Sequence, residues 1–310
     1  MSKAIIIGNI CLDLVLGEIP NYPEWGTEVL LPGYVMRPGG AALNAALALS
    51  SLGVPTFIVG TLGKDDFGRR ILSCLEHSKI HTDFLFVIPE KQTGLSVGIT
   101  NAYTKERSFL TELGAQESLS LDHLESIVSF LEEGDFVLLC GYFLSPRLRT
   151  SRLSSLLLTY YERGARLLLD TGWPPEGWTK RVCQEVRNLL PLFDYFLPNE
   201  EEFEKVCGMD QDLAFLSRKG TIVKKGEKGC EAHTSHGIIF QPTVKVKAVD
   251  TIGAGDYFNA GFIFALWKGY SLPLALRCAN LVASFNISSS PQRESLVKRE
   301  TIERVIAGKD

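Results

Sequence analysis

The chain has 310 residues, of which 45% are hydrophobic and 22% charged, and its formal net charge at pH 7 is -4. This is the composition of a globular protein that can bury a sizeable core. Lysine and arginine form no cluster of the kind that binds nucleic acid, so we expect no such partner. No apolar run reaches 18 residues, and the short one before Gly8 predicts a strand, so we expect a cytoplasmic protein without a membrane span.

Cysteine and histidine spacing indicates no metal site. The seven cysteines are odd in number and widely separated, and the sequence contains no C-x-x-C. The five histidines have no ligand spacing either. We therefore expect reduced, buried thiols.

Short apolar runs alternate with longer helical patterns along the chain. The runs predict strands at 4–8, 56–60, 84–87, 136–140, 166–170, 195–198 and 220–224. The helical patterns lie at 41–52, 66–77, 121–131, 149–163, 180–189, 200–207, 256–267 and 274–285, with one more near the C-terminus. This alternation predicts an α/β fold with a mostly parallel sheet, helices on both faces, and ligands beyond the carboxyl ends of the strands.

Two stretches interrupt this alternation. Residues 27–36 and 95–113 are rich in β-type residues, with no helix between them and their neighbours. They predict antiparallel strands that stand off the main sheet and cover a substrate site. We expect one domain over 1–310, with lid strands from about 12–36 and 95–113.

The most informative segment precedes the helical pattern at 257–267. Gly253, Ala254 and Gly255 leave the backbone N–H groups of a helix N-terminus open to an anion such as a phosphate. Asp256 follows at once, and a carboxylate there can accept the proton of a hydroxyl that attacks phosphorus. The alternative is that Asp256 is an ordinary acid of a helix cap or first turn.

A second glycine-rich segment lies upstream. Gly39 and Gly40 let backbone N–H groups approach a ligand closely. Asn44, one turn into the next helix, offers a donor and an acceptor to sugar hydroxyls. The alternative is a tight turn followed by a polar surface side chain.

Together and in this order, the two segments resemble the PfkB (ribokinase-like) family of carbohydrate kinases. The later segment matches that family's D-T-x-G-A-G-D signature at every constrained position. The earlier one matches its glycine-rich signature at Gly39, Asn44, Ala46, Gly53 and Gly63. The resemblance covers nearly the whole chain. It implies a ribokinase-like fold with a small β-sheet lid, and the use of ATP and Mg²⁺.

The resemblance also implies roles for single residues. Asp256 corresponds to the catalytic base, and charge on the γ-phosphate would be stabilised by the N–H groups of Gly253, Ala254 and Gly255. Asp13 corresponds to the acid that binds substrate hydroxyls, although a turn acid is the simpler alternative. The same substrate pocket would include Gly39, Gly40 and Asn44.

On the nucleotide side, Asn199 and Glu202 match an N-x-x-E element, with Glu202 acting on Mg²⁺ through water. The alternative is a solvated acidic helix start. Further nucleotide-binding positions are Lys224, Gly226, Gly229 and Asn280. Asp250 corresponds to a ligand of a monovalent cation such as K⁺, completed by the loop 288–295, which lacks the glycine common in ribokinases.

The substrate is less well defined. Arg107, in the second off-sheet stretch, is a candidate contact to a carboxylate or sugar hydroxyl, or a solvent-facing side chain. We expect a kinase for a sugar or sugar acid. A nucleoside kinase is the alternative, and a catalytically silent ligand-binding paralogue is a third. We also expect a homodimer formed through the lid, because an exposed edge strand needs cover.

Overall fold

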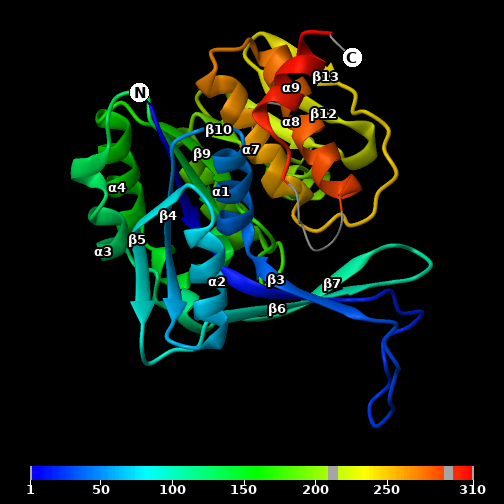
Figure 1. The fold of residues 1–310 in the computed structure, drawn as a ribbon. Helices are drawn as coiled ribbons and strands as arrows, with labels where there is room; N and C mark the ends of the chain where they lie inside the picture. Colours follow the sequence, from blue (N-terminus) through cyan, green and yellow to red (C-terminus); the bar gives the residue numbers. More distant parts are fainter. Residues whose placement is uncertain (1, 209–215, 290–295, 309–310) are drawn as a thin grey trace.

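A mostly parallel sheet forms the centre of the molecule, as the sequence predicts (Figure 1). The computed structural model describes residues 2–208, 216–289 and 296–308, and within them nine strands join in the order β13-β12-β11-β10-β9-β8-β1-β4-β5. The strands are β1 (Ala4–Gly8), β4 (Thr56–Gly63), β5 (Ile80–Ile88), β8 (Phe136–Cys140), β9 (Arg166–Asp170), β10 (Tyr195–Phe196), β11 (Gly220–Lys224), β12 (Cys230–Thr234) and β13 (Gly237–Gln241). Neighbours from β5 to β11 pair in parallel, and β12 and β13 form an antiparallel hairpin that the sequence analysis missed.

Helices cover both faces of this sheet. They are α1 (Ala41–Ser51), α2 (Asp66–Glu76), α3 (Leu121–Glu125), α4 (Ser151–Glu162), α5 (Lys180–Leu189), α6 (Glu200–Cys207), α7 (Ala254–Trp267), α8 (Leu272–Ser288) and α9 (Arg299–Ile306). Within the described ranges, no helix combines the length and the apolar character needed to cross a bilayer.

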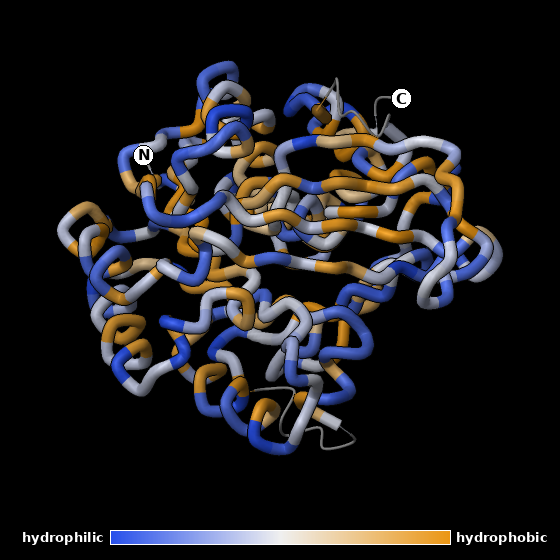
Figure 2. Tube along the Cα trace, turned by 90° about the horizontal axis from the view of Figure 1, so that it is seen from below, coloured by the Kyte–Doolittle hydropathy of each residue, from blue (hydrophilic) through white to orange (hydrophobic). Residues whose placement is uncertain are grey.

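The sheet separates two hydrophobic cores. Side chains alternate along a strand, so in β1 Ile6 packs into the core that contains α1, α7 and α8, whereas Ile5 and Ile7 pack into the core beneath α4 and α5. Figure 2 shows hydrophobic segments along the middle strands and hydrophilic ones in many of the connecting loops. The two cores hold the carboxyl ends of the strands in fixed positions.

A second, smaller sheet projects from the body (Figure 1). It consists of β2 (Cys11–Leu16), β3 (Tyr34–Gly39), β6 (Gly94–Thr100) and β7 (Arg107–Glu112), in the order β3-β2-β6-β7. The pairs β2–β3 and β6–β7 are antiparallel, and a parallel pairing of β2 with β6 joins them. We call these four strands the small sheet.

Several elements differ from their expected extent. The strands expected at 56–60 and 84–87 are longer, at Thr56–Gly63 and Ile80–Ile88. The strand expected over 27–36 begins only at Tyr34, because Pro32 and Gly33 are poor strand residues. The helix expected over 121–131 ends at Glu125 and is followed by a separate 3₁₀ turn. There the Ser126 hydroxyl donates to the His123 carbonyl at 2.6 Å, a local bond that competes with helix continuation.

Asp65 ties α2 to the small sheet. Its Oδ1 accepts hydrogen bonds from the Gly68 amide at 2.8 Å and the Thr93 hydroxyl at 2.7 Å, and its Oδ2 accepts one from the Thr93 amide at 2.7 Å. Burial alone would raise the pKa of Asp65, but these hydrogen bonds outweigh it and hold the pKa below the usual value. Asp65 is therefore both the N-cap of α2 and the anchor of the segment that enters β6.

Replacing Asp65 with alanine should lower the free energy of unfolding by about 1–3 kcal/mol, because a cap is lost and buried donors lose their acceptor. Asp66→Ala is the matched control, since the exposed Asp66 forms a surface ion pair with Arg69 and its loss should change stability by about 0.5 kcal/mol or less. Urea unfolding measures both variants, and equal effects would contradict the anchoring role.

The same carboxylate predicts a pH dependence. A lowered pKa in the folded state stabilises the protein above the unfolded pKa, and this stabilisation is lost as the pH falls through the folded pKa. The stability gap between wild type and Asp65→Asn should therefore shrink on acidification. A gap that stays constant between neutral pH and the onset of acid unfolding would contradict the assignment.

Candidate active site

Two cavities meet at Asp256. The larger has a volume of about 1000 Å³ and the smaller about 160 Å³, and Asp256 is the one acid, among the described residues, that lines both. The side chain is half-buried. A group bound in one cavity can therefore approach a group bound in the other at this carboxylate.

The start of α7 positions Asp256. Gly253 is the N-cap, with a left-handed φ of 80° that a side chain would disfavour, and no side chain caps the helix. The Ala254 amide donates to the Thr251 carbonyl at 3.3 Å. The Asp256 carboxylate instead accepts a hydrogen bond from the side-chain amide of buried Asn44, with Nδ2 2.8 Å from Oδ2. Asp256 is thus not the capping residue of α7, and α1 and α7 hold it jointly.

The smaller cavity contains most of the predicted substrate residues. Asp13, Gly40 and Asn44 line it. Gly39 lies beside it, and a Cβ at Gly39 would come within 2.0 Å of the Asp13 carboxylate, so only glycine leaves room for that acid. The remaining lining residues are Asn9, Cys11, Ser96, Phe109, Thr111, Gln116, Leu144, Ile252, Gly253 and Asp256.

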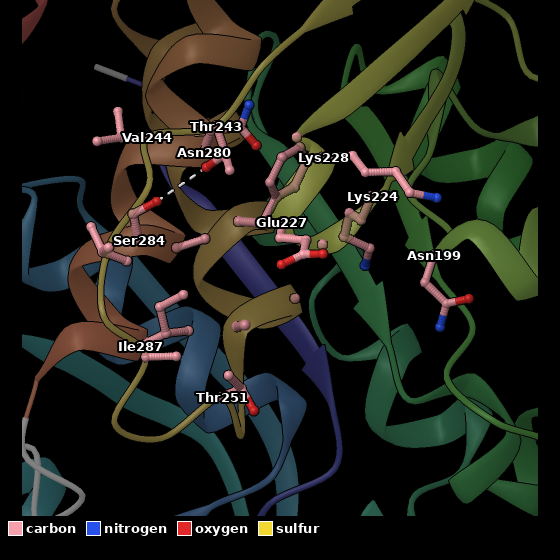
Figure 3. Close-up of a pocket in the computed structure, with 18 of the residues that line it drawn as sticks. Asn199, Lys224, Glu227, Lys228, Thr243, Val244, Thr251, Asn280, Ser284 and Ile287 are labelled. Carbon is pink, nitrogen blue, oxygen red and sulfur yellow. Dashed lines mark hydrogen bonds between the residues drawn. The ribbon is translucent and has the colours of Figure 1, made fainter. Parts of the chain in front are cut away.

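The larger cavity contains the predicted nucleotide residues. Asn199, Lys224, Gly226, Gly229 and Asn280 all line it, and Figure 3 shows Lys224 and Asn199 on the side opposite Ser284 and Ile287. The Asn280 side-chain amide nitrogen donates to two backbone carbonyls at the end of β13, those of Gln241 at 3.1 Å and of the following Pro242 at 3.3 Å. Asn280 therefore fixes the cavity wall.

Lys224 is buried in a polar cluster at the end of β11. Its Nζ lies 2.7 Å from Asp170 Oδ2 and 3.4 Å from Asn259 Oδ1, and Asn259 Nδ2 donates to the same Asp170 oxygen at 2.5 Å. Burial alone would lower the pKa of Lys224, but Asp170 and Glu202 outweigh it and raise the pKa. The lysine is therefore cationic at neutral pH and faces the cavity.

The N-x-x-E element forms a capping box at the start of α6. Asn199 Oδ1 accepts a hydrogen bond from the backbone N–H of Glu202, and Glu202 Oε2 accepts one from the backbone N–H of Asn199, both at 2.8 Å. Glu202 is buried rather than solvated, and burial, with a smaller contribution from Asp170, raises its pKa to about 7. Both residues also line the larger cavity, so they combine a structural role with access to a ligand.

Arg107 and Asp250 lie differently from expectation. Arg107 lines the larger cavity rather than the smaller, and burial lowers its pKa while the charge of Asp250 opposes the shift. Asp250 forms an ion pair with Arg37, with Nη2 2.6 Å from Oδ2. Residues 290–295 of the loop expected to complete a cation site with Asp250 lie outside the described residues.

A family model described as "pfkB family carbohydrate kinase" matches residues 1–299. The chain belongs to this family. It is therefore a kinase, and the predicted ribokinase-like fold is confirmed by the comparisons that follow.

Relatives of known name cover almost the full chain. The chain is 25% identical to ribokinase of Bacillus subtilis over 311 residues, covering 99% of this chain and 100% of the relative. It is 27% identical to 5-dehydro-2-deoxygluconokinase of Geobacillus thermodenitrificans over 323 residues, covering 97% and 92%. The relatives thus include kinases with different substrates.

Solved structures share the fold. Ribokinase of Arabidopsis thaliana, complexed with ribose and ATP, superposes with a TM-score of 0.80 at 24% identity, covering 99% of each chain. A nucleoside kinase of Burkholderia thailandensis, in complex with inosine, superposes with a TM-score of 0.81 at 19% identity, covering 99% of this chain and 96% of that one. At these identities the likeness establishes the fold of this kinase.

The structure of the kinase also reveals site residues that the sequence analysis missed. Asn259 lies one helical turn after Asp256, a spacing that places both on one side of α7 and could have drawn attention to it. Arg37 stands in the glycine-rich segment, but its partner Asp250 is distant in sequence. Residues of β7 in the smaller cavity, such as Phe109 and Thr111, follow only from the folding of the small sheet.

Replacing Lys224 with methionine should lower the free energy of unfolding of this kinase by about 3 kcal/mol, because Asp170 is left as an uncompensated buried charge. The double variant Lys224→Met/Asp170→Asn should recover much of that loss. Lys228→Met is the control, because the exposed Lys228 forms a surface ion pair with Glu200, and its loss should cost about 0.5 kcal/mol or less. Denaturant unfolding of the wild type, the two single variants Lys224→Met and Asp170→Asn and the double variant gives the coupling free energy, and additive effects in the double variant would contradict the pairing.

Proposed function

We propose that this kinase transfers the γ-phosphoryl group of ATP to a hydroxyl of an unphosphorylated sugar, with Asp256 as the general base. One observation carries the proposal: the Asp256 carboxylate lies where the two cavities meet and is held there by Asn44. A base must be within hydrogen-bond reach of the hydroxyl and close to the transferring phosphate, and a carboxylate that borders both cavities supports this role.

In the reaction, the sugar hydroxyl gives its proton to Asp256 as its oxygen bonds to the γ-phosphorus. The bond between that phosphorus and the bridging oxygen breaks, and ADP leaves with the electron pair. At the open start of α7, Ala254 and Gly255 line the larger cavity and Gly253 lines the smaller, and the partial positive charge of this helix start stabilises the transferring phosphoryl group. Asn44 keeps the Asp256 carboxylate oriented toward the sugar.

The larger cavity is proposed as the ATP site. Its volume suits a nucleotide, and Lys224 supplies a fixed positive charge near the start of α7. Mg²⁺ brought with ATP neutralises phosphate charge, and it needs only one or two protein carboxylates because it retains several waters. Glu202 fits that need, because its carboxylate is held by a hydrogen bond from the backbone N–H of Asn199 and the residue lines the cavity.

The smaller cavity favours a neutral polyol. Its polar lining contains one acid besides Asp256, namely Asp13, and no lysine or arginine among the described residues. A phosphate or carboxylate on the substrate would find no cationic partner there. The volume of about 160 Å³ is below the 300–1,000 Å³ typical of larger ligands, which suits a single sugar ring.

A nucleoside kinase is the second candidate, favoured by one observation. Phe109, which is half exposed on β7, lines the smaller cavity and could stack on a base. The nucleoside kinase with the same fold is compatible with this alternative.

A substrate panel separates the two candidates. We expect ATP-dependent phosphorylation of a pentose or hexose, with weaker use of sugar acids and sugar phosphates because the smaller cavity lacks a cation. The measurement is ADP release with Mg-ATP across sugars, sugar acids, sugar phosphates, inositols and nucleosides. Preference for a nucleoside by a factor of about ten in kcat/KM, or 1.4 kcal/mol, would overturn the sugar assignment.

The variant Asp256→Asn should lower kcat by about 10³-fold, since it removes the base while keeping a polar side chain beside Asn44. Sugar and ATP affinities, measured by calorimetry, should change little. Asp83→Asn, an exposed position on β5, is the control and should keep wild-type turnover. Near-normal kcat in Asp256→Asn would exclude Asp256 as the base.

A further inference from the structure

A buried ion pair joins the small sheet to the turn before α7. Arg37 Nη2, on β3, lies 2.6 Å from Asp250 Oδ2, and the two side chains are 5% and 13% exposed. The other carboxylate oxygen, Oδ1, accepts a hydrogen bond from the Ile252 amide at 2.9 Å. Both oxygens of Asp250 therefore have partners supplied by the chain itself.

This ion pair lies at the start of residues 250–256, the turn that carries the proposed base Asp256 and that we call the catalytic turn. Asp250 begins the segment that leads through Ile252 to Gly253, the N-cap of α7. Fixing the Asp250 carboxylate fixes the backbone from which the start of α7 and Asp256 project. A positive charge beside Asp250 is therefore part of what holds the catalytic turn in place.

The geometry does not fit a monovalent cation at Asp250. Such an ion needs several oxygen ligands, and here one carboxylate oxygen faces a guanidinium and the other an amide donor. An ion bound at the same carboxylate would also lie beside the charge of Arg37, and like charges repel strongly where water is largely excluded. Arg107 adds to this positive environment, since Asp250 acts electrostatically on its guanidinium.

We propose that Arg37 is a built-in cation, which supplies at Asp250 the positive charge that the family resemblance assigns to a monovalent ion. Phosphoryl transfer by this kinase is accordingly independent of K⁺. The kinetic part of this inference rests on the proposed function. The binding part does not, because it concerns only whether the Asp250 site can take an ion.

Wild-type turnover in KCl, NaCl and tetramethylammonium chloride tests the kinetic part directly. At an ionic strength of about 0.1 M in each salt, the rates should agree within about twofold, because general screening is then equal. Activation by K⁺ of about fivefold or more over tetramethylammonium would overturn the proposal.

Removing the internal cation should create a requirement for an external one. In tetramethylammonium chloride, Arg37→Ala should lose about tenfold or more in kcat, the scale expected when a stabilising charge is removed from a site. KCl should restore part of the loss. Arg37→Lys keeps the charge, so its turnover should stay insensitive to K⁺. The control is Arg70→Ala, which removes an exposed arginine on α2 that contacts Met36, the residue before Arg37, and this variant should behave as wild type.

Thermal unfolding gives a readout that needs no turnover. K⁺ bound only by the folded variant should raise the melting temperature of Arg37→Ala by about 2–4 °C over tetramethylammonium, whereas the wild type should show no such difference. Arg37→Ala/Asp250→Ala, which lacks the carboxylate, should not respond. If Arg37→Ala folds and responds to K⁺ in neither melting nor rate, Arg37 is not a substitute for an ion.

Different measurements refute the role of Arg37 and the proposed function. A wild type that phosphorylates no member of the substrate panel would refute the proposed function, while the melting experiment would still decide the role of Arg37. If Arg37→Ala does not fold, the comparison of wild type with Arg37→Lys in the three salts decides it, and K⁺ activation of either protein overturns the proposal.

Discussion

The position of Asp256 between the two cavities depends on the burial of α7 in the hydrophobic core. Every residue from Tyr257 to Ala265 is buried, so this part of the helix is enclosed on all sides and its axis is fixed within the core. Its start is the part that reaches the cavities. An uncapped helix start, with its partial positive charge and the Asp256 carboxylate, is thereby held at the junction of two cavities. The hydrophobic core and the proposed catalytic base therefore share one helix, α7.

The charges around the larger cavity are balanced in a way that suits a polyphosphate. Four acids line it, namely Asp170, Glu202, Glu227 and Asp256, and free carboxylates would repel such a ligand. The ion pair with Lys224 neutralises Asp170, and the raised pKa of Glu202, about 7, leaves that group partly protonated near neutral pH. The cavity is therefore less acidic than its residue types suggest.

Local signals predicted much of the fold and of the site. Apolar runs such as 136–140 and 166–170 gave the strands β8 and β9 with their observed bounds, because a buried parallel strand reads as an uninterrupted apolar segment. Of the small residues singled out in the sequence, Ala254 and Gly255 line the larger cavity, and Gly40 and Gly253 line the smaller.

What the sequence could not show depends on contacts between distant segments. The partner of Arg37 is Asp250, and nothing in the pattern around either residue links them. The capping box of Asn199 and Glu202 is readable from spacing, but its burial beside Asp170 follows only from the packing of α6 against the sheet. Likewise, Arg107 was expected beside the predicted substrate residues and instead lines the larger cavity, because the course of β7 sets where its side chain points.

The central claim is that Asp256 takes the proton of the sugar hydroxyl that attacks ATP. The most direct test is a crystal structure of the kinase with its preferred sugar and a non-hydrolysable ATP analogue. The account predicts one sugar hydroxyl within about 2.6–3.2 Å of the Asp256 carboxylate, on the line toward the γ-phosphate. A bound sugar with every hydroxyl beyond hydrogen-bond reach of Asp256, and another base at the γ-phosphate, would contradict it.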